Sequence, residues 1–367
     1  MKMKLGVLSA GGDCAGINAA VHWLVYSALD KDLAPLRGTM FDITGILGGW
    51  QGLIEVKPEK KESLKQWLMP LSIETVRTWD RYGGSRLGTS KVNPFDPKND
   101  TSELLMKNFN KLGFDALVVL GGVDDLQVSY KLYKAGLKVV GIPKTIDRDI
   151  SGTDYTLGFD SALNSITSDI DRLRITAGSH SRVFVVECMG RNAGWLALEA
   201  GEASGVSIIL IPEHDFVTER VVSLLKMRKK SGVRYSIVLV SEGAKPRGME
   251  PAYERRGMDG FGHHFLGGIG GFIAEEIQKS SDLEVRYVAL RHLQRGGWPS
   301  AHDRRMGRKF GVAALDMIVS EDFGRMVSVE HGTISSVPLK KALHKLNLVN
   351  VEKTYDTKNY KTLDLIL

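Results

Sequence analysis

Two carboxylates, Asp147 and Asp149, lie two residues apart in the segment Pro143-Lys144-Thr145-Ile146-Asp147-Arg148-Asp149. Carboxylates can accept a proton from a reacting hydroxyl, and their oxygens are ligands for hard cations. The apolar run at residues 137–142 predicts a buried strand. The pair therefore follows the carboxyl end of a strand, where open α/β sheets bind their ligands. Arg148 lies between the two acids and must either serve such a site or disable it.

Glycine pairs follow or approach the ends of three predicted elements, at residues 11–12, 83–84 and 121–122. Glycine lets backbone amides approach an oxyanion, and the start of a helix favours phosphate. One pair is ordinary turn chemistry, but three in the first third of the chain favour phosphate binding. Residues 11–16 do not form G-x-G-x-x-G, and Thr89 occupies the place of the P-loop lysine. A dinucleotide dehydrogenase and a P-loop ATPase are therefore both disfavoured.

The composition fits a globular protein that handles a small anionic molecule. The 367 residues are enough for two domains, and 43% of them are hydrophobic, which allows a sizeable core. The net charge of +6 suits an anionic substrate and does not require nucleic acid. The densest basic run, at residues 226–230, lacks aromatic neighbours and is better explained as a solvated helix end.

Cysteine usage and hydropathy indicate a cytoplasmic protein. Cys14 and Cys188 are far apart and form neither a metal-binding spacing nor a disulfide framework. Both are expected to be small buried residues. The N-terminal segment reaches a glycine loop too early for a signal peptide, and no apolar run is long enough to span a membrane. We expect neither a membrane nor a nucleic-acid partner.

Short apolar runs of β type alternate with helical patterns along much of the chain. The runs lie at residues 5–8, 116–120, 139–142, 182–187, 207–211 and 236–240. Most of them lead through a loop into a helix, which is typical of parallel strands covered on both faces. Because this unit recurs in both halves, the sequence predicts an α/β fold with two doubly wound, mostly parallel-sheet domains facing a cleft.

Five segments, in this order, give the chain a specific family resemblance. They are residues 6–13, 143–147, 152–159, 189–191 and 292–297. Together they resemble the 6-phosphofructokinase A-type family over about residues 5–335. The pyrophosphate-dependent branch is the most similar. Members transfer a phosphoryl group from ATP or pyrophosphate to the 1-hydroxyl of fructose 6-phosphate, a step of glycolysis.

The resemblance implies a division of the chain and a set of partners. Residues 1–158 with about 294–335 would bind the phosphoryl donor. Residues 159–293 with about 336–367 would bind the sugar phosphate. Fructose 6-phosphate, pyrophosphate or ATP, and Mg²⁺ are the expected ligands. The family forms homodimers or homotetramers with a shared active site.

The resemblance also assigns roles to individual residues. Asp147 would be the base, with Thr145 beside it, and Arg191 would offset charge on the transferring group. Asp149 matches a position near the metal. The residues expected to bind the sugar phosphate are Arg182, Met189, Gly190, Glu242, Arg286, His292 and Arg295, of which Arg182 and Arg286 would come from a neighbouring subunit. The residues expected to bind the donor are Gly11, Gly12, Lys91, Gly122, Asp124, Lys144 and Arg148.

The donor side departs from the family pattern. Val123 replaces an acid that helps to hold magnesium, and a valine side chain offers no oxygen ligand. Asp125 is a candidate replacement, two steps further along the loop. Asp124 stands where ATP users have glycine, and together with Lys144 it favours pyrophosphate. Lys91 occupies a position that is often arginine.

Two arginines also depart from the family pattern. Arg291 replaces a glycine, and Arg148 replaces an asparagine. In one interpretation the guanidinium of Arg148 supplies charge in place of a lost magnesium ion and lowers the pKa of Asp147. In the other, Arg148 and Val123 mark a homologue that has lost catalysis. Three hypotheses follow: a pyrophosphate-dependent phosphofructokinase, a silent homologue that binds sugar phosphate as a regulatory or partner subunit, and a phosphotransferase with a changed acceptor or donor.

Overall fold

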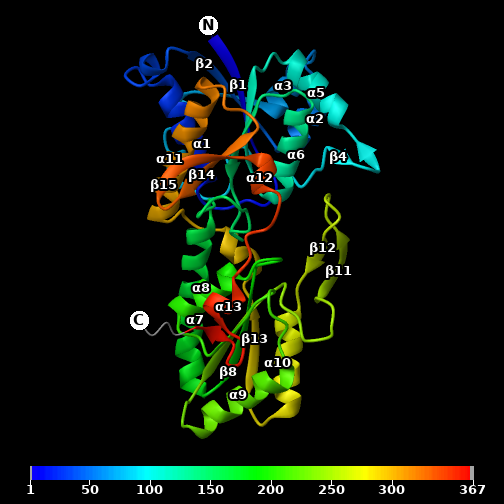
Figure 1. Ribbon diagram of the computed structural model, residues 1–367, viewed down its shortest axis with the longest axis vertical. Helices are drawn as coiled ribbons and strands as arrows, with labels where there is room; N and C mark the ends of the chain where they lie inside the picture. Colours follow the sequence, from blue (N-terminus) through cyan, green and yellow to red (C-terminus); the bar gives the residue numbers. More distant parts are fainter. Residues whose placement is uncertain (1, 364–367) are drawn as a thin grey trace.

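The computed structural model describes residues 2–363 and is built around two large sheets, one above the other along the long axis (Figure 1). The larger sheet has seven strands in the order β15-β14-β7-β6-β1-β2-β3. Its central strands run parallel, and the edge strands β3 and β15 are antiparallel. The strands are β1 (Lys2–Ser9), β2 (Met40–Ile46), β3 (Leu68–Leu71), β6 (Ala116–Gly121), β7 (Val139–Pro143), β14 (Arg325–Glu330) and β15 (Thr333–Pro338).

The smaller sheet has four parallel strands in the order β13-β8-β10-β9. These are β8 (Val183–Cys188), β9 (Ile208–Leu210), β10 (Ser236–Ser241) and β13 (Val285–Ala289). Strands β8 and β10 are buried along their whole length, because helices cover the sheet. The covering helices are α7 (Phe159–His180), α8 (Trp195–Ala203), α9 (Thr218–Lys230) and α10 (Ile269–Ser280).

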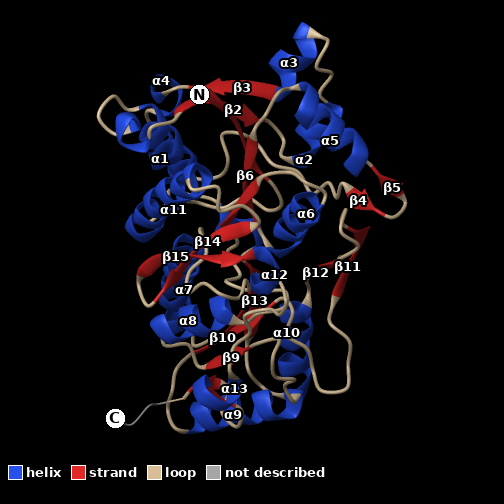
Figure 2. Ribbon diagram, turned by 45° about the horizontal axis from the view of Figure 1, so that its top comes forward, coloured by secondary structure: helices blue, strands red, loops and turns tan. Residues whose placement is uncertain are grey.

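Helices cover both faces of the larger sheet (Figure 2). On one face α1 (Ile17–Leu29) and α11 (Ala301–Val319) pack against each other. On the other lie α2 (Trp50–Glu55), α3 (Lys61–Trp67), α5 (Ser102–Lys111) and α6 (Val123–Lys134). Along β6, the side chains of Val118 and Leu120 pack on the face covered by α1 and α11. The side chains of Leu117 and Val119 pack on the face covered by α2, α5 and α6. The predicted α/β fold with two mostly parallel sheets is confirmed.

Shorter elements complete the chain. They are η1 (Ala34–Arg37), α4 (Ile73–Val76), η2 (Trp79–Arg81), β4 (Phe95–Asp96), β5 (Asn99–Asp100), β11 (Tyr253–Met258), β12 (His264–Leu266), η3 (Arg291–Arg295), α12 (Leu339–Ala342), α13 (Val351–Thr354), β16 (Tyr355–Asp356) and β17 (Lys361–Thr362). Of the helices within residues 2–363, none combines the length and apolarity needed to cross a bilayer.

After β15 and α12 the chain returns from the larger sheet to the smaller one (Figure 1). We call residues 343–349, which make this crossing, the strap. The backbone N of Asn347, in the strap, donates to the carbonyl oxygen of Asp149 at 2.8 Å. Its side-chain Nδ2 donates to the carbonyl oxygen of Arg148 at 2.9 Å. Trp195 Nε1 in turn donates to the Asn347 carbonyl oxygen. The strap thereby holds the segment that carries the paired acids. Residues 364–367, the end of the predicted sugar-binding range, lie outside the described residues.

Candidate active site

A cleft of about 430 Å³ lies where the carboxyl ends of strands from both sheets meet. Gly11 and Gly12 follow β1, Gly122 follows β6, and Thr145 and Asp147 follow β7. From the smaller sheet, Arg191 follows β8 and Glu242 follows β10. Parallel strands point their carboxyl ends the same way, so loops distant in sequence converge there. The cleft lining includes all three predicted catalytic residues and Asp149.

Burial raises the pKa values of the acids that follow β7 and β10 in the cleft. Burial raises the pKa of Asp147, although the cations of Arg295, Arg191 and Lys91 oppose the shift. Burial and the charge of Asp147 raise the pKa of Asp149 to about 7. The same two causes raise the pKa of Glu242 to about 7, and Arg191 opposes them. A carboxyl group with a raised pKa is a better proton acceptor near neutral pH.

Two carboxylate oxygens in the cleft are orphaned. Asp147 Oδ1 and Asp149 Oδ1 are buried, and neither has a hydrogen-bond partner within residues 2–363. Mg²⁺ typically binds one or two carboxylates together with phosphate oxygens and water. The pair therefore fits a magnesium ion shared with a phosphate. A metal cage made of protein side chains alone is not present in the described part of the chain.

Asp125 does not replace the acid that is absent at Val123. Helix α6 begins at Val123, so both residues lie in its first turn. Asp125 Oδ2 accepts from the backbone N of Gly122 and Oδ1 accepts from Trp50 Nε1, each at 3.3 Å. Burial raises the pKa of Asp125 to about 6, opposed by the cation of Lys144. Its carboxylate thus caps the N-terminus of α6 and is not available as a metal ligand.

Lys144 lies beneath the glycine loop and is only 2% exposed. Its Nζ donates to the carbonyl oxygens of Ala10 at 2.5 Å and Gly12 at 2.6 Å. Burial lowers the pKa of Lys144, and the nearby charge of Asp125 opposes this shift. The predicted donor-binding lysine therefore fixes the shape of the loop, with its ammonium group held by backbone carbonyls.

The interpretation of Arg148 as a substitute for metal charge is wrong in this structure. Its backbone has φ 55°, and its side chain is not part of the cleft lining. Nη1 pairs with Glu199 Oε1 at 2.5 Å, and the guanidinium lies 5.3 Å and 5.1 Å from the ring centroids of Phe159 and Trp195. Because the positive φ turns the side chain toward α7 and α8, Arg148 contacts the smaller-sheet domain instead of the donor pocket.

The predicted sugar-phosphate residues are divided between two ends of the smaller sheet. Glu242 and Arg295 line the cleft, and Arg295 Nη1 donates to the Asp13 carbonyl oxygen at 2.9 Å. Met189 and Gly190 directly precede Arg191 after β8. His292 lies on η3, in a separate open hollow with Gly296 and Gly297.

Arg182 and Arg286 lie at the opposite, amino ends of their strands. Arg182 immediately precedes β8, and Arg286 is the second residue of β13. Both side chains bind Glu284, at 2.8 Å and 2.6 Å. One copy of the chain therefore does not bring these two arginines into the cleft with Asp147.

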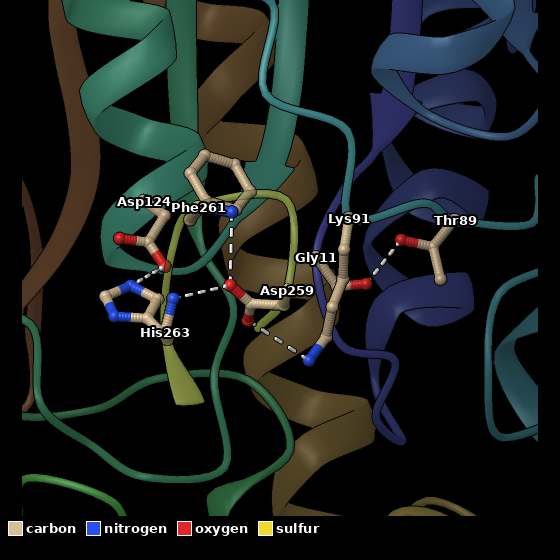
Figure 3. Close-up of polar contacts among 7 residues, drawn as sticks. All are labelled: Gly11, Thr89, Lys91, Asp124, Asp259, Phe261 and His263. Atoms are coloured by element: carbon tan, nitrogen blue, oxygen red, sulfur yellow. Dashed lines mark hydrogen bonds and ion pairs between the residues drawn. The ribbon is translucent and has the colours of Figure 1, made fainter. Parts of the chain in front are cut away.

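Several cleft residues were missed in the sequence. Asp259, Phe261 and His263 reach the cleft from the tip of the β11–β12 hairpin, and His344 and Lys345 reach it from the strap. Figure 3 shows the hairpin residues beside Lys91 and Asp124. Glycines at 260 and 262, next to paired histidines, signal a turn that carries titratable groups. Nothing in the sequence places that turn across the cleft.

Comparison with known proteins identifies the family. A family model described as Phosphofructokinase matches residues 4–318. The pyrophosphate–fructose 6-phosphate 1-phosphotransferase of Dictyoglomus thermophilum is 42% identical, over 96% of each chain. This chain is a member of the phosphofructokinase family. Within the family, the ATP-dependent 6-phosphofructokinase of Chloroflexus aurantiacus is 39% identical, over 95% of this chain and 93% of that one.

The solved structures agree with this fold. A pyrophosphate-dependent phosphofructokinase from Nitrosospira multiformis matches with a TM-score of 0.81 and 22% identity, over 99% of this chain and 89% of that one. Relatives named for pyrophosphate and relatives named for ATP have nearly the same sequence identity to this phosphofructokinase family member. Overall similarity therefore does not identify the donor, which has to be argued from individual residues.

Proposed function

We propose that this chain transfers a phosphoryl group from pyrophosphate to the 1-hydroxyl of fructose 6-phosphate, with Asp147 as the base. The observation that carries the proposal is the environment of Asp147. Its carboxyl group is buried, has a raised pKa and an unpartnered oxygen, and lines one cleft with Arg191 and the glycine loops. A base in this state can accept the hydroxyl proton, while cations and amides stabilise the phosphoryl charge.

The neighbouring residues have distinct tasks in this reaction. Thr145 Oγ1 accepts from the Asp147 backbone N at 3.1 Å and so orients the base. Arg191, Arg295 and Lys91 bring positive charge to the cleft, and Glu242 offers oxygens to sugar hydroxyls. Asp149 and Asp147 would hold a magnesium ion together with the donor phosphates, and the ion would neutralise phosphate charge.

Two residues support pyrophosphate as the donor. Asp124, in the first turn of α6, presents a carboxylate where a nucleotide phosphate chain would need open space. Lys144 fixes the Gly11–Gly12 loop from below. Among relatives, both pyrophosphate and ATP are named as donors.

Arg182 and Arg286 support a shared active site. Because both lie at the far end of the smaller sheet, they would bind sugar phosphate in the cleft of a second copy of the chain. In this arrangement residues 1–158 with about 294–335 bind the donor, and residues 159–293 with about 336–367 bind the sugar. A homodimer or homotetramer would complete each site.

Val123 favours a second candidate, a silent homologue that binds sugar phosphate as a regulatory or partner subunit. Its side chain lines the cleft and supplies no oxygen for a metal. The test is to supply fructose 6-phosphate with pyrophosphate or ATP, with and without magnesium, and to measure fructose 1,6-bisphosphate. We expect turnover with pyrophosphate, reduced about 10²–10⁴-fold in Asp147→Asn. The exposed Asp32→Asn is the matched control. Sugar-phosphate binding without turnover from either donor would instead support the silent homologue.

A further inference from the structure

The β11–β12 hairpin pairs with no other strand among residues 2–363. Along the chain it follows β10 and precedes α10 of the smaller-sheet domain, and its tip extends toward the larger-sheet domain (Figure 1). A two-stranded hairpin is only marginally stable by itself. The position of this one therefore depends on what its tip contacts.

The tip is a tightly bonded turn that lies against the larger-sheet domain. Asp259 Oδ1 accepts from the backbone N of Phe261 at 3.1 Å and of His263 at 3.0 Å. A Cβ at Gly260 would overlap the Lys91 carbonyl oxygen, so only glycine allows this close approach. Phe261 packs against the hydrophobic cluster around α2, α5 and α6.

Two side chains of the tip bind residues that the sequence predicts to contact the donor (Figure 3). Asp259 Oδ2 lies 3.6 Å from Lys91 Nζ, and Asp124 Oδ2 accepts a hydrogen bond from His263 Nε2 at 3.1 Å. The side chain of Asp259 is only 6% exposed. Burial opposes its ionisation, but the amides of His263 and Phe261 and the cation of Lys91 lower its pKa overall. Asp259 is thus a charged partner that orients Lys91.

Asp124 presents an electrostatic problem for an anionic donor. Its carboxylate lines the same cleft as Gly12 and Gly122, whose backbone suits phosphate oxygens. An unpaired carboxylate there would repel a diphosphate. The imidazole N–H of His263 donates a hydrogen bond to the Asp124 carboxylate and so offsets its negative charge. The hairpin thereby makes Asp124 compatible with an anion.

We propose that the hairpin tip is a second determinant of donor choice, in which His263 and Asp259 position Asp124 and Lys91 around an inorganic diphosphate. Phe261 and His263 also line the cleft with Asp124, and in this proposal they obstruct a nucleoside attached to the donor. The inference rests on the proposed function, because it concerns the donor of that reaction.

His263→Ala tests the positioning role, and His264→Ala is the matched control, since His264 is adjacent but not part of the cleft lining. We expect His263→Ala to raise KM for pyrophosphate roughly tenfold, the effect of one charge-assisted hydrogen bond. The kcat and KM for fructose 6-phosphate should be unchanged. In an Asp124→Gly background the same substitution should have no further effect. An equal effect in both backgrounds would overturn the positioning role.

Donor choice is tested by replacing residues 259–263 with Asn-Gly. We expect the ratio of kcat/KM for pyrophosphate to that for ATP to fall at least about tenfold, since the wall beside the donor is removed. A ratio within twofold of wild type would overturn the proposal. If the wild-type protein turns over neither donor, the hairpin role is tested by calorimetric titration of the variants with pyrophosphate. Weaker pyrophosphate binding by His263→Ala but not by His264→Ala would then support the hairpin role, while the absence of turnover refutes the proposed reaction. Equal binding by the two variants would overturn the hairpin role.

Discussion

Arg148 Nη1 and Glu199 Oε1 form an ion pair 2.5 Å long, which joins the loop of the paired acids to helix α8. The two side chains are only 26% and 32% exposed. Arg148 Nε also donates to the Asp154 carbonyl oxygen at 3.1 Å. These contacts give Arg148, which lies between Asp147 and Asp149, a structural role. It anchors the loop to the smaller-sheet domain.

The ion pair should contribute measurably to stability. In a double-mutant cycle of Arg148→Ala and Glu199→Ala, we expect a coupling of roughly 1–2 kcal/mol in the free energy of unfolding, because the pair is partly buried. The exposed pair Lys229–Asp282 is the control and should show no measurable coupling. Urea denaturation of both cycles gives the values. Absence of coupling between Arg148 and Glu199 would contradict the anchoring role.

Val123→Asp should strengthen magnesium binding by itself, because Arg148 does not occupy the metal position. The new carboxylate would lie at the start of α6, where the helix dipole favours negative charge. We expect half-maximal activity at a several-fold lower magnesium concentration, and tighter magnesium binding in calorimetry with pyrophosphate present. Gln127→Asp, one turn further along the cleft wall, should have a smaller effect. Equal effects of the two variants would argue against a specific metal position.

The buried acids should make the stability of the free protein depend on pH. Asp149 and Glu242 have pKa values of about 7, above their ordinary values near 4. Between these values the folded state holds more protons than the unfolded state, so stability is greatest at the acidic end and falls as pH rises toward 7. Glu242→Gln should reduce this fall by roughly 1 kcal/mol or more between pH 5 and 7.5. Urea unfolding at the two pH values measures it, and an unchanged fall in the variant would refute the raised pKa.

Arg291 has φ 45°, a backbone conformation that is costly for a side chain with a Cβ. Glycine, which the family resemblance predicts at this position, adopts it freely. We expect Arg291→Gly to raise the free energy of unfolding by about 1 kcal/mol. Arg305→Gly, within helix α11, should lower it by about 1 kcal/mol. A loss of stability in both variants would show that contacts of the Arg291 side chain outweigh the strain.

Local sequence patterns predicted the sheets and the centre of the site. Apolar runs ending in glycine or acid identified β6 and β7, and the family resemblance predicted Asp147, Arg191 and Glu242, which line one cleft in the structure. The orientation of Arg148 was not predictable, because it depends on a positive φ and on Glu199, which lies 51 residues away. The contact of His263 with Asp124 spans 139 residues between two domains. Neither pairing follows from periodicity or local propensity.

The strap has a consequence for the biosynthesis of the protein. Asn347 binds the backbone of Arg148 and Asp149, although it follows Arg148 by 199 residues and lies beyond the family-matched residues 4–318. Domains generally fold as units while the chain is still being made, amino-terminal part first. A nascent chain can thus form much of both sheets before the segment that fastens the loop of the paired acids has left the ribosome. The loop of the paired acids should therefore take its final position only after Asn347 has emerged.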